Sequence, residues 1–308
     1  MTGFCLPVFP ADKQSAGDII LTGGRAGVVT LVSPSFESTE DFPKMHNCEI
    51  HSLALSPDGK LAVSGDNSGE LVAWDVAARK GVKLSPAHHG DVRRVVFSKS
   101  GRYFATASKD REIKVWDSAT LKLLTTLKGH KSYVYDLDFS PDEKYIASVG
   151  SDYLLIVWDT QSGKKLREKA NAHYEAIFQV RFSPDGKTIY TASSDAFIKL
   201  WDFDSLNNKA VYKGNKMEIQ AIAVSPDGKI IVSGGRDRSI LAFSTETGKL
   251  LSTVDYPNNF LLTGLTYISN GNSLVASDAT GEIMNLDIKT WTFSKVKALK
   301  PILALAVR

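Results

Sequence analysis

The sequence lacks the features that mark secreted and membrane proteins. Its two cysteines, Cys5 and Cys48, are too few for a disulfide framework and too far apart for a CxxC motif. No apolar run approaches the roughly 18 residues of a membrane-spanning helix, and the N-terminus lacks the basic, apolar, small-residue order of a secretory signal. These absences predict a protein of the cytoplasm or the nucleus, with no transmembrane segment.

Motifs for nucleic acids, nucleotides and metals are scarce as well. The net charge is +3 and no five like charges follow one another, so the sequence gives little indication of nucleic acid as a partner. It holds no Gly-rich phosphate loop and no metal-spaced Cys/His cluster. We therefore expect no cofactor, no metal site and no catalytic residues.

What the sequence does contain is a repeat. A hydrophobic pair, usually Trp-Asp, returns every 42 or 43 residues, and it is intact at Trp74-Asp75, Trp116-Asp117, Trp158-Asp159 and Trp201-Asp202. Its place is kept with other residues at Phe243-Ser244, Leu286-Asp287 and Val32. Self-similarity at this period is typical of repeat folds, so seven units account for all 308 residues as one domain.

Each unit has the pattern of four antiparallel strands. In the fourth unit a mainly apolar strand over 134–139 is followed by a Ser-Pro-Asp-Glu turn and a second strand over 145–149. A third strand over 154–158 ends at the Trp, and a polar fourth strand follows over 164–168. A lone sheet of this kind exposes two apolar faces, and packing sheet on sheet around a ring buries them.

With these repeats the chain resembles the WD-repeat (WD40) β-propeller family over essentially its whole length. The resemblance implies an all-β fold, a single seven-bladed β-propeller of four-stranded antiparallel blades. We expect the blades at about 3–43, 46–86, 88–128, 130–170, 173–213, 215–256 and 258–298. An inner strand is expected at 4–9, and 302–308 is an extra strand of the inner type that either closes the ring or begins a further repeat array.

Three sets of residues resemble catalytic triads. Four histidines (His46, His88, His130 and His173) share one column of the repeat, with Ser or Thr ten residues and Asp six residues before the Trp column. A catalytic site is built once, whereas these sets recur with the period of the fold. The family resemblance implies structural tetrads instead: His88–Thr106–Asp110–Trp116, His130–Ser148–Asp152–Trp158 and His173–Thr191–Asp195–Trp201. In the second unit the Asp column holds Ser68, so we expect an incomplete set there.

The resemblance also implies a binding face, formed by the loop after the His column and the loop between the second and third strands. A variable column just inside the first strand holds His51, Arg93, Tyr135, Phe178, Gln220 and Thr263. Aromatic candidates for partner binding gather on units four and five: Tyr133, Tyr135, Tyr153, Tyr174 and Phe178. Cationic candidates, suited to carboxylate or phosphate, lie on units three and six: Arg93, Lys109, Arg111, Arg236 and Arg238.

The leading hypothesis is a non-enzymatic protein–protein interaction scaffold, a subunit or N-terminal propeller of a multiprotein complex that holds a peptide or protein segment on the loop face. The alternative is recognition of a phosphopeptide, RNA or phosphoinositide through the Arg and Lys residues of that face. Steep salt dependence of binding would distinguish the alternative. An enzyme would need an acid or nucleophile outside the repeat pattern, and none is identified.

Overall fold

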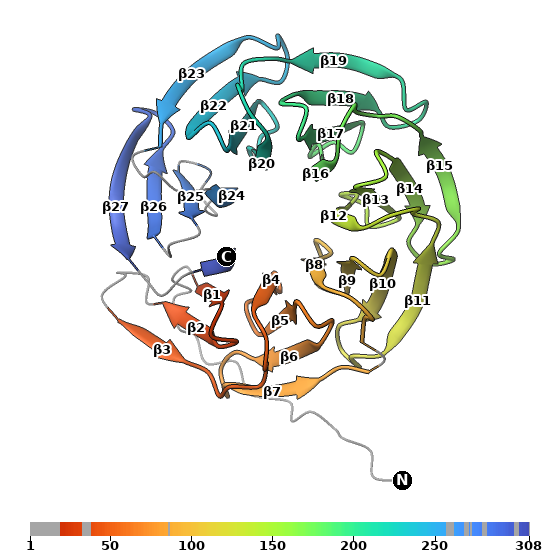
Figure 1. Ribbon diagram of the computed structural model, residues 1–308, viewed down its shortest axis with the longest axis vertical. Coiled ribbons are helices and arrows are strands. Elements are labelled where there is room, and N and C mark those ends of the chain that lie inside the picture. Colours follow the sequence, from red (N-terminus) through yellow and green to blue (C-terminus); the bar gives the residue numbers. More distant parts are fainter. Residues whose placement is uncertain are drawn as a thin grey trace.

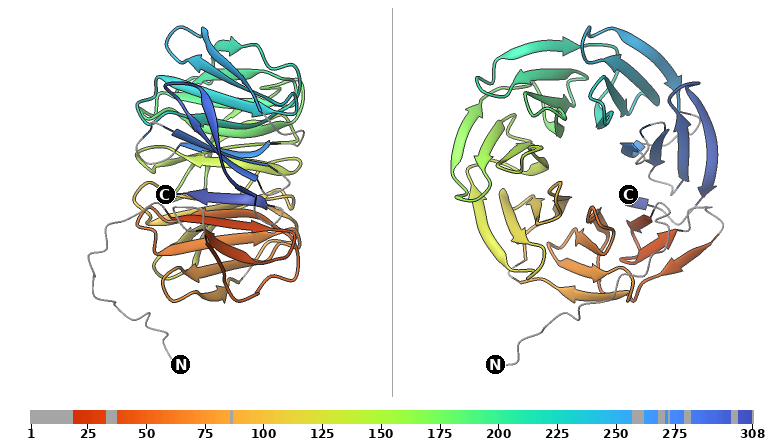
Figure 2. Two further views of the ribbon diagram at one scale, coloured as in Figure 1. Left: turned by 90° about the vertical axis from the view of Figure 1, so that its left-hand side faces the viewer. Right: turned by 180° about the vertical axis from the view of Figure 1, so that it is seen from behind.

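The structure is a ring of seven four-stranded antiparallel sheets around a central channel (Figure 1). It is a computed structural model that describes residues 19–32, 38–85, 87–256, 262–267, 271, 273–278, 282–298 and 302–307. The predicted all-β, seven-bladed propeller is confirmed. Seen from the side, the ring is a disc about as thick as one strand is long (Figure 2). The described part of the chain has no helix of the length and apolarity that a bilayer span requires.

Blades 2 to 7 each take four consecutive strands, numbered from the channel to the rim. Blade 2 consists of β4 (Ile50–Leu55), β5 (Leu61–Asp66), β6 (Leu71–Asp75) and β7 (Lys80–Lys83). Blade 3 consists of β8 (Val92–Phe97), β9 (Tyr103–Ser108), β10 (Glu112–Asp117) and β11 (Leu123–Lys128). Blade 4 consists of β12 (Val134–Phe139), β13 (Tyr145–Gly150), β14 (Leu155–Asp159) and β15 (Lys165–Lys169).

The next three blades repeat this order. Blade 5 consists of β16 (Ile177–Phe182), β17 (Thr188–Ser193), β18 (Ile198–Asp202) and β19 (Asn208–Tyr212). Blade 6 consists of β20 (Ile219–Val224), β21 (Ile230–Gly235), β22 (Ser239–Ser244) and β23 (Leu250–Asp255). Blade 7 consists of β24 (Leu262–Tyr267), β25 (Ser273–Asp278), β26 (Glu282–Asp287) and β27 (Thr292–Ala298).

Blade 1 joins the two ends of the chain. Its sheet has the order β28 (Ile302–Val307), β1 (Ile20–Gly24), β2 (Val29–Val32) and β3 (Thr39–Asp41). Strand β28 pairs antiparallel with β1, from Ile20 opposite Val307 to Gly24 opposite Ile302, and so takes the inner position (Figure 1). The expected inner strand at 4–9 lies outside the described residues.

The hydrophobic core is divided into clusters between neighbouring blades. Trp158 of blade 4 lies in a cluster with β9 and β10 of blade 3, and Trp201 of blade 5 lies in one with blade 4. Phe243 and Leu286 occupy the same position in blades 6 and 7. The Trp column is therefore the apolar contact between one blade and the preceding one, and a ring is the arrangement that gives most blades two such contacts.

The inner strands of blades 2 to 7 share a local irregularity that shapes the channel. In each, the pairing with the second strand shifts across one residue near the start, the pattern of a β-bulge. The bulge residues are His51, Arg93, Tyr135, Phe178, Gln220 and Thr263. The first five line the central cavity. In blades 2 to 6 the variable column of the repeat is thus the set of residues that the bulges direct into the channel.

Candidate functional site

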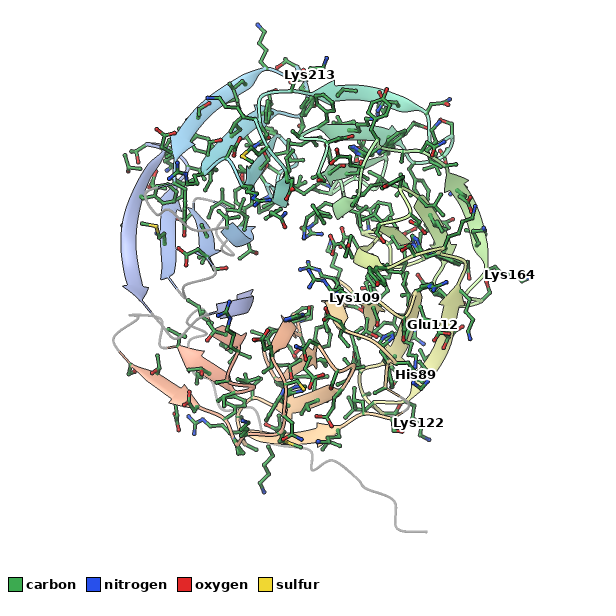
Figure 3. All side chains as sticks on the ribbon, viewed as in Figure 1. His89, Lys109, Glu112, Lys122, Lys164 and Lys213 are labelled. Atoms are coloured by element: carbon green, nitrogen blue, oxygen red, sulfur yellow. The ribbon has the colours of Figure 1, made fainter. Side chains whose placement is uncertain are left out.

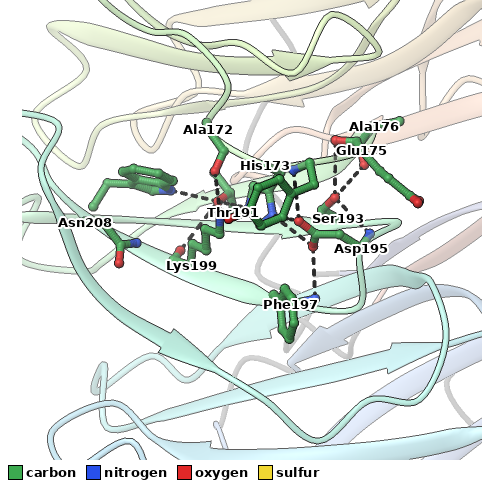
Figure 4. Close-up of polar contacts among 12 residues, drawn as sticks. Ala172, His173, Glu175, Ala176, Thr191, Ser193, Asp195, Phe197, Lys199 and Asn208 are labelled. Atoms are coloured by element: carbon green, nitrogen blue, oxygen red, sulfur yellow. Dashed lines mark hydrogen bonds and ion pairs between the residues drawn. The ribbon is translucent and has the colours of Figure 1, made fainter.

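The expected tetrads are continuous chains of hydrogen bonds. In blade 5 the Nδ1 atom of His173 lies 2.9 Å from Asp195 Oδ2, and Nε2 lies 2.8 Å from the Thr191 hydroxyl (Figure 4). The same hydroxyl accepts a hydrogen bond from Trp201 Nε1 at 2.8 Å. The chain links the loop before β16 to β17 and β18, and blades 3 and 4 contain the same arrangement.

Blade 2 corrects one expectation. Ser68 does not complete the set, but Asp66, the last residue of β5, lies 2.9 Å from His46 Nδ1. Ser64 bonds both His46 Nε2 and Trp74 Nε1, so the tetrad is complete with its carboxylate two residues earlier. Ser68 donates to Asp66 at 2.7 Å. The signal in the sequence was an Asp at a strand end where the next four blades have Ser or Gly.

These sets are unsuited to nucleophilic chemistry. The hydroxyls of Ser64, Thr106, Ser148 and Thr191 are fully buried, and each is already bonded by an indole and an imidazole. Burial lowers the pKa of His46 and of His173, which keeps both imidazoles neutral, with Nδ1 as donor to Asp and Nε2 as acceptor. Glu70 completes a His46–Asp66–Glu70 group of metal-ligand type, yet His46 is committed to its tetrad and Glu70 pairs with Lys83.

The loop face is held together by backbone hydrogen bonds between its two loops. In blade 4, Ser151 N donates to Tyr133 O at 2.9 Å, and the same pairing occurs in blade 3 between Lys109 and Asp91. The turn of blade 4 also contacts the loop that leads into blade 5, because Ala172 N donates to Tyr153 O at 3.0 Å. These hydrogen bonds fix the backbone of the loops, so side chains on neighbouring loops lie close to one another.

Three of the five aromatic candidates form an exposed group, here called the tyrosine patch: Tyr133, Tyr153 and Tyr174. Their exposed fractions are 45%, 40% and 82%. Cations flank the patch, with Lys109 Nζ 5.8 Å from the Tyr133 ring centre and Lys199 Nζ 5.0 Å from that of Tyr174. Three large exposed rings on connected loops are unusual for a surface that contacts only water.

The other two aromatic candidates lie at the channel mouth. Tyr135 and Phe178 are bulge residues, partly buried, with ring centres 5.3 Å apart. Arg93, the bulge residue of blade 3, lies over the Tyr135 ring at 5.8 Å. The five aromatic residues thus divide into an outer patch and an inner pair, and the pair consists of the two that belong to the variable column just inside the first strand.

Two cationic candidates are neutralised by a buried carboxylate. Asp91 lies 2.9 Å from Lys109 Nζ, 3.5 Å from Arg93 Nη1 and 2.8 Å from His51 Nδ1. Burial alone would raise the pKa of Asp91, but the hydrogen bonds of His51 and Lys109 and the charge of Arg93 lower it to about 2. Figure 3 places Lys109 toward the centre of the disc, in contrast to the rim residues Lys122, Lys164 and Lys213.

The remaining cationic candidates are dispersed. Arg111 is exposed and has a positive φ of 74°, in the turn after β9. Arg236 and Arg238 are exposed on blade 6, where Arg236 lies 3.5 Å from Glu218. Blade 6 is separated from blade 3 by two blades, so the structure does not bring the five cations into one basic surface.

The channel holds charged residues that the sequence analysis missed. Arg94, Asp136, Asp138 and Arg181 extend from the inner strands of blades 3, 4 and 5. Arg94 Nε lies 2.9 Å and Arg181 Nη1 2.5 Å from the Asp136 carboxylate. Within the sequence of a single blade, these residues cannot be distinguished from other polar residues of a strand. Only an alignment of all inner strands would have shown charge confined to three consecutive blades.

The sequence of this chain is similar to known protein families and to a known protein. The chain matches the family described as IFT122 first beta-propeller over residues 91–307, more than two thirds of its length. It matches the family described as WD domain, G-beta repeat over residues 40–75. It is also similar to Ribosomal RNA-processing protein 9 of Saccharomyces cerevisiae, with 37% identity over 90 residues, 28% of this chain and 15% of that protein. The chain thus spans a small part of the length of that relative.

Proposed function

The chain belongs to the family of IFT122 first β-propellers within the WD-repeat proteins, and from this premise we propose that it is an interaction scaffold that holds a peptide or protein segment of a larger complex on its loop face. The observation that carries the proposal is the tyrosine patch. Tyr133, Tyr153 and Tyr174 expose three rings on loops that are hydrogen-bonded to one another.

The physical basis is the balance between apolar area and conformational entropy. A Tyr side chain offers a large ring with few rotatable bonds, so little entropy is lost when a partner covers it. Fixed backbone at the patch lowers the ordering cost further. The flanking Lys199 favours a partner segment that combines acidic and apolar residues.

Anion recognition by the same face has weaker support. Asp91 neutralises much of the charge of Arg93 and Lys109, and Arg236 pairs with Glu218. A phosphopeptide, an RNA strand or a phosphoinositide would need several cations free for its phosphates. The candidate cations also lie on blades 3 and 6 rather than along one stripe.

The test compares two variants that each replace three exposed apolar or aromatic side chains by alanine. One is Tyr133→Ala/Tyr153→Ala/Tyr174→Ala, and the other removes exposed aliphatic residues of the rim, Val82→Ala/Leu124→Ala/Leu166→Ala. Wild type and both variants are used to capture partners from native lysate at about 0.15 M and about 0.5 M salt, with quantitative mass spectrometry as the readout.

We expect partners that bind wild type and the rim variant to be lost from the tyrosine variant, and to remain bound to wild type at the higher salt. Melting curves must show that both variants remain folded. If the tyrosine variant retains every partner, the patch is not the binding site. If binding to wild type disappears at high salt, anion recognition replaces the proposal.

A further inference from the structure

Two inward-facing columns of the channel are each charged in two of blades 3 to 5 and small in blades 2, 6 and 7; the uncharged exceptions within blades 3 to 5 are Gln179 and Val96. The residue after the bulge is Ser52, Ala221 or Gly264 in blades 2, 6 and 7, but Arg94 or Asp136 in blades 3 and 4. Two residues further along, the blades have Ala54, Ala223 and Thr266 in contrast to Asp138 and Arg181. The fold therefore forms without charge at these positions, and burying ions costs free energy.

Part of the charged set connects neighbouring blades. Asp136 accepts a hydrogen bond from Val180 N at 2.9 Å, and Asp138 accepts one from Phe182 N at 2.8 Å. Blade 2 achieves the same contact with a neutral side chain, because Val95 N donates to the Ser52 hydroxyl at 2.7 Å. The connection between blades thus does not require a carboxylate, and it does not require Arg94.

The two arginines differ in how many of their donors are used. Arg181 donates from Nη1 to Asp136 and to Val180 O, and from Nη2 to Gln179. Arg94 has only its Nε beside Asp136, and its two Nη nitrogens make no hydrogen bond to any described residue. Its side chain is 32% exposed and lines the central cavity of about 770 Å³. A pair of Nη donors is therefore presented to the channel.

The charge balance of the cluster favours a ligand with one negative charge. Burial raises the pKa of Asp138 to about 6, against the lowering effect of Arg181 and Arg94. With Asp138 ionised, two arginines balance two carboxylates, and with Asp138 protonated the cluster carries one net positive charge. One carboxylate neutralises that state, whereas a doubly charged phosphate would leave excess negative charge in a buried site.

We propose that the Nη donors of Arg94 bind a single carboxylate of a partner segment in the channel, and that Asp138 controls the affinity through its own charge. The identity of the carrier rests on the proposed scaffold function, since a segment lying on the loop face reaches the channel past Tyr135 and Phe178. The carboxylate is that of an acidic side chain or of a chain end. Planar carboxylate fits the guanidinium fork in a bidentate way.

The protonation of Asp138 depends on the charged groups that face it. These are Asp136 on its own strand, Arg94 on β8 and Arg181 on β16. Other charged or titratable side chains that line the cavity are His51, Arg93, Lys99, Tyr135 and Tyr267. A bound carboxylate adds negative charge beside Asp138, so binding takes up a proton and strengthens as the pH falls from about 7.5 to about 5.5.

Small probes test the channel independently of any partner. Four compounds are titrated into the full chain: acetyl-glutamate amide, acetyl-glycine, acetyl-phosphoserine amide and acetyl-lysine amide. The readout is the NMR signal of the Arg94 Nε–H group, assigned by its absence in Arg94→Lys. We expect the first two to shift the signal with a Kd of about 10 mM, and the comparison of side-chain with terminal carboxylate identifies the better source.

Variants test whether carboxylate binding depends on the guanidinium fork of Arg94 or merely on a positive charge at that position. Arg94→Lys keeps a cation beside Asp136 but lacks the fork, so carboxylate binding, followed by backbone amide signals of blades 3 to 5, is expected to weaken about tenfold. Asp138→Asn is expected to bind several-fold more tightly at pH 7.5 and to lose the pH dependence. Arg111→Gln, on the exposed turn, is expected to bind as wild type does.

Three results would overturn the proposal: no shift of the Arg94 signal by either carboxylate up to about 50 mM, tighter binding of the phosphoserine or lysine probe, or equal affinity in Arg94→Lys and wild type. The triple tyrosine variant should bind the probes normally. If that variant keeps every protein partner while the channel binds the carboxylate probes, the tyrosine patch has failed and the channel site stands. If it loses its partners while the wild-type channel binds neither carboxylate, the channel site has failed and the scaffold proposal stands.

Discussion

Blades 2 to 5 and blades 6 and 7 perform the same architectural task with different chemistry. The first four each contain a complete His–Ser/Thr–Asp–Trp chain. In blade 6, Asn215 bonds Ser233 at 2.9 Å and Phe243 replaces the Trp, so the chain has a single link. In blade 7 the corresponding positions are the apolar Ala276 and Leu286.

A large apolar residue at the Trp position is therefore common to blades 2 to 7, whereas the complete polar chain is found in blades 2 to 5. Apolar contact between blades persists through Phe243 and Leu286. Blade 7 instead joins Tyr256 to Asp278 at 3.3 Å, and Asp278 occupies the strand end that Asp66 occupies in blade 2. A blade can thus be closed by burial alone, and polar chains make its loop conformation specific.

The largest difference in unfolding free energy is expected when the residue of the His column is replaced by alanine in one blade of each region. His130→Ala removes two buried hydrogen bonds and leaves the Ser148 hydroxyl proton without an acceptor and Asp152 with one donor fewer, which should cost about 2–4 kcal/mol of unfolding free energy. Asn215→Ala removes one bond and should cost about 1 kcal/mol. Urea unfolding at neutral pH measures both. Equal losses would mean that the tetrad adds nothing to the stability of its blade.

Acid should weaken the tetrad blades in two steps. Burial lowers the pKa of His46 and His173 below the unfolded value of 6.5, so the unfolded chain binds more protons and stability is lost as the pH falls below 6.5. Burial would raise the pKa of Asp110, but the hydrogen bond and charge of His88 lower it to about 2, so its contribution, on the order of 2 kcal/mol, is lost between about pH 4 and 2.

The measurement is urea unfolding across this pH range, followed by tryptophan fluorescence, since four of the five tryptophans belong to tetrads. Asp110→Asn should reduce the lower step, to which Asp91 also contributes, and keep the upper one. Stability that stays constant from pH 7 to pH 5 would contradict the neutral, buried state assigned to the two histidines.

The smallest effect is expected from building a tetrad into blade 6. Ser233 is in place, and Asp237 occupies the Asp column, where it now accepts a hydrogen bond from Lys216 N at 2.7 Å. Asn215→His and Phe243→Trp together should restore the chain with a favourable coupling energy of about 1 kcal/mol, although the larger indole alone is expected to destabilise by overpacking. A double-mutant cycle in urea isolates the coupling. Purely additive effects would show that blade 6 does not position the pair.

Particular residues show how far sequence reasoning extends. The 42-residue period and the Trp column predicted seven blades, because each blade must bury the same two faces. The tetrads were implied by the resemblance to the WD-repeat family, on His, Ser/Thr, Asp and Trp columns that recur with the period of the repeat. Asp66 escaped the same reasoning, since a strand end and a turn position two residues apart both direct a side chain to the loop. The variable column separated Tyr135 and Phe178 from the other aromatic candidates, but it did not show that Tyr133, Tyr153 and Tyr174 are exposed.

The number of blades and the order of strands within a blade could be predicted from the sequence alone, because they depend on interactions within about 40 residues. The resemblance to the WD-repeat family added the polar chains. The structure was needed to see the pairing of β28 with β1, which completes blade 1. It was also needed for the contact of His51 with Asp91 and for the meeting of Arg94, Asp136 and Arg181 at the channel. Those contacts join different blades. Their geometry depends on the angle at which one sheet packs on the next, and no local pattern of residues encodes that angle.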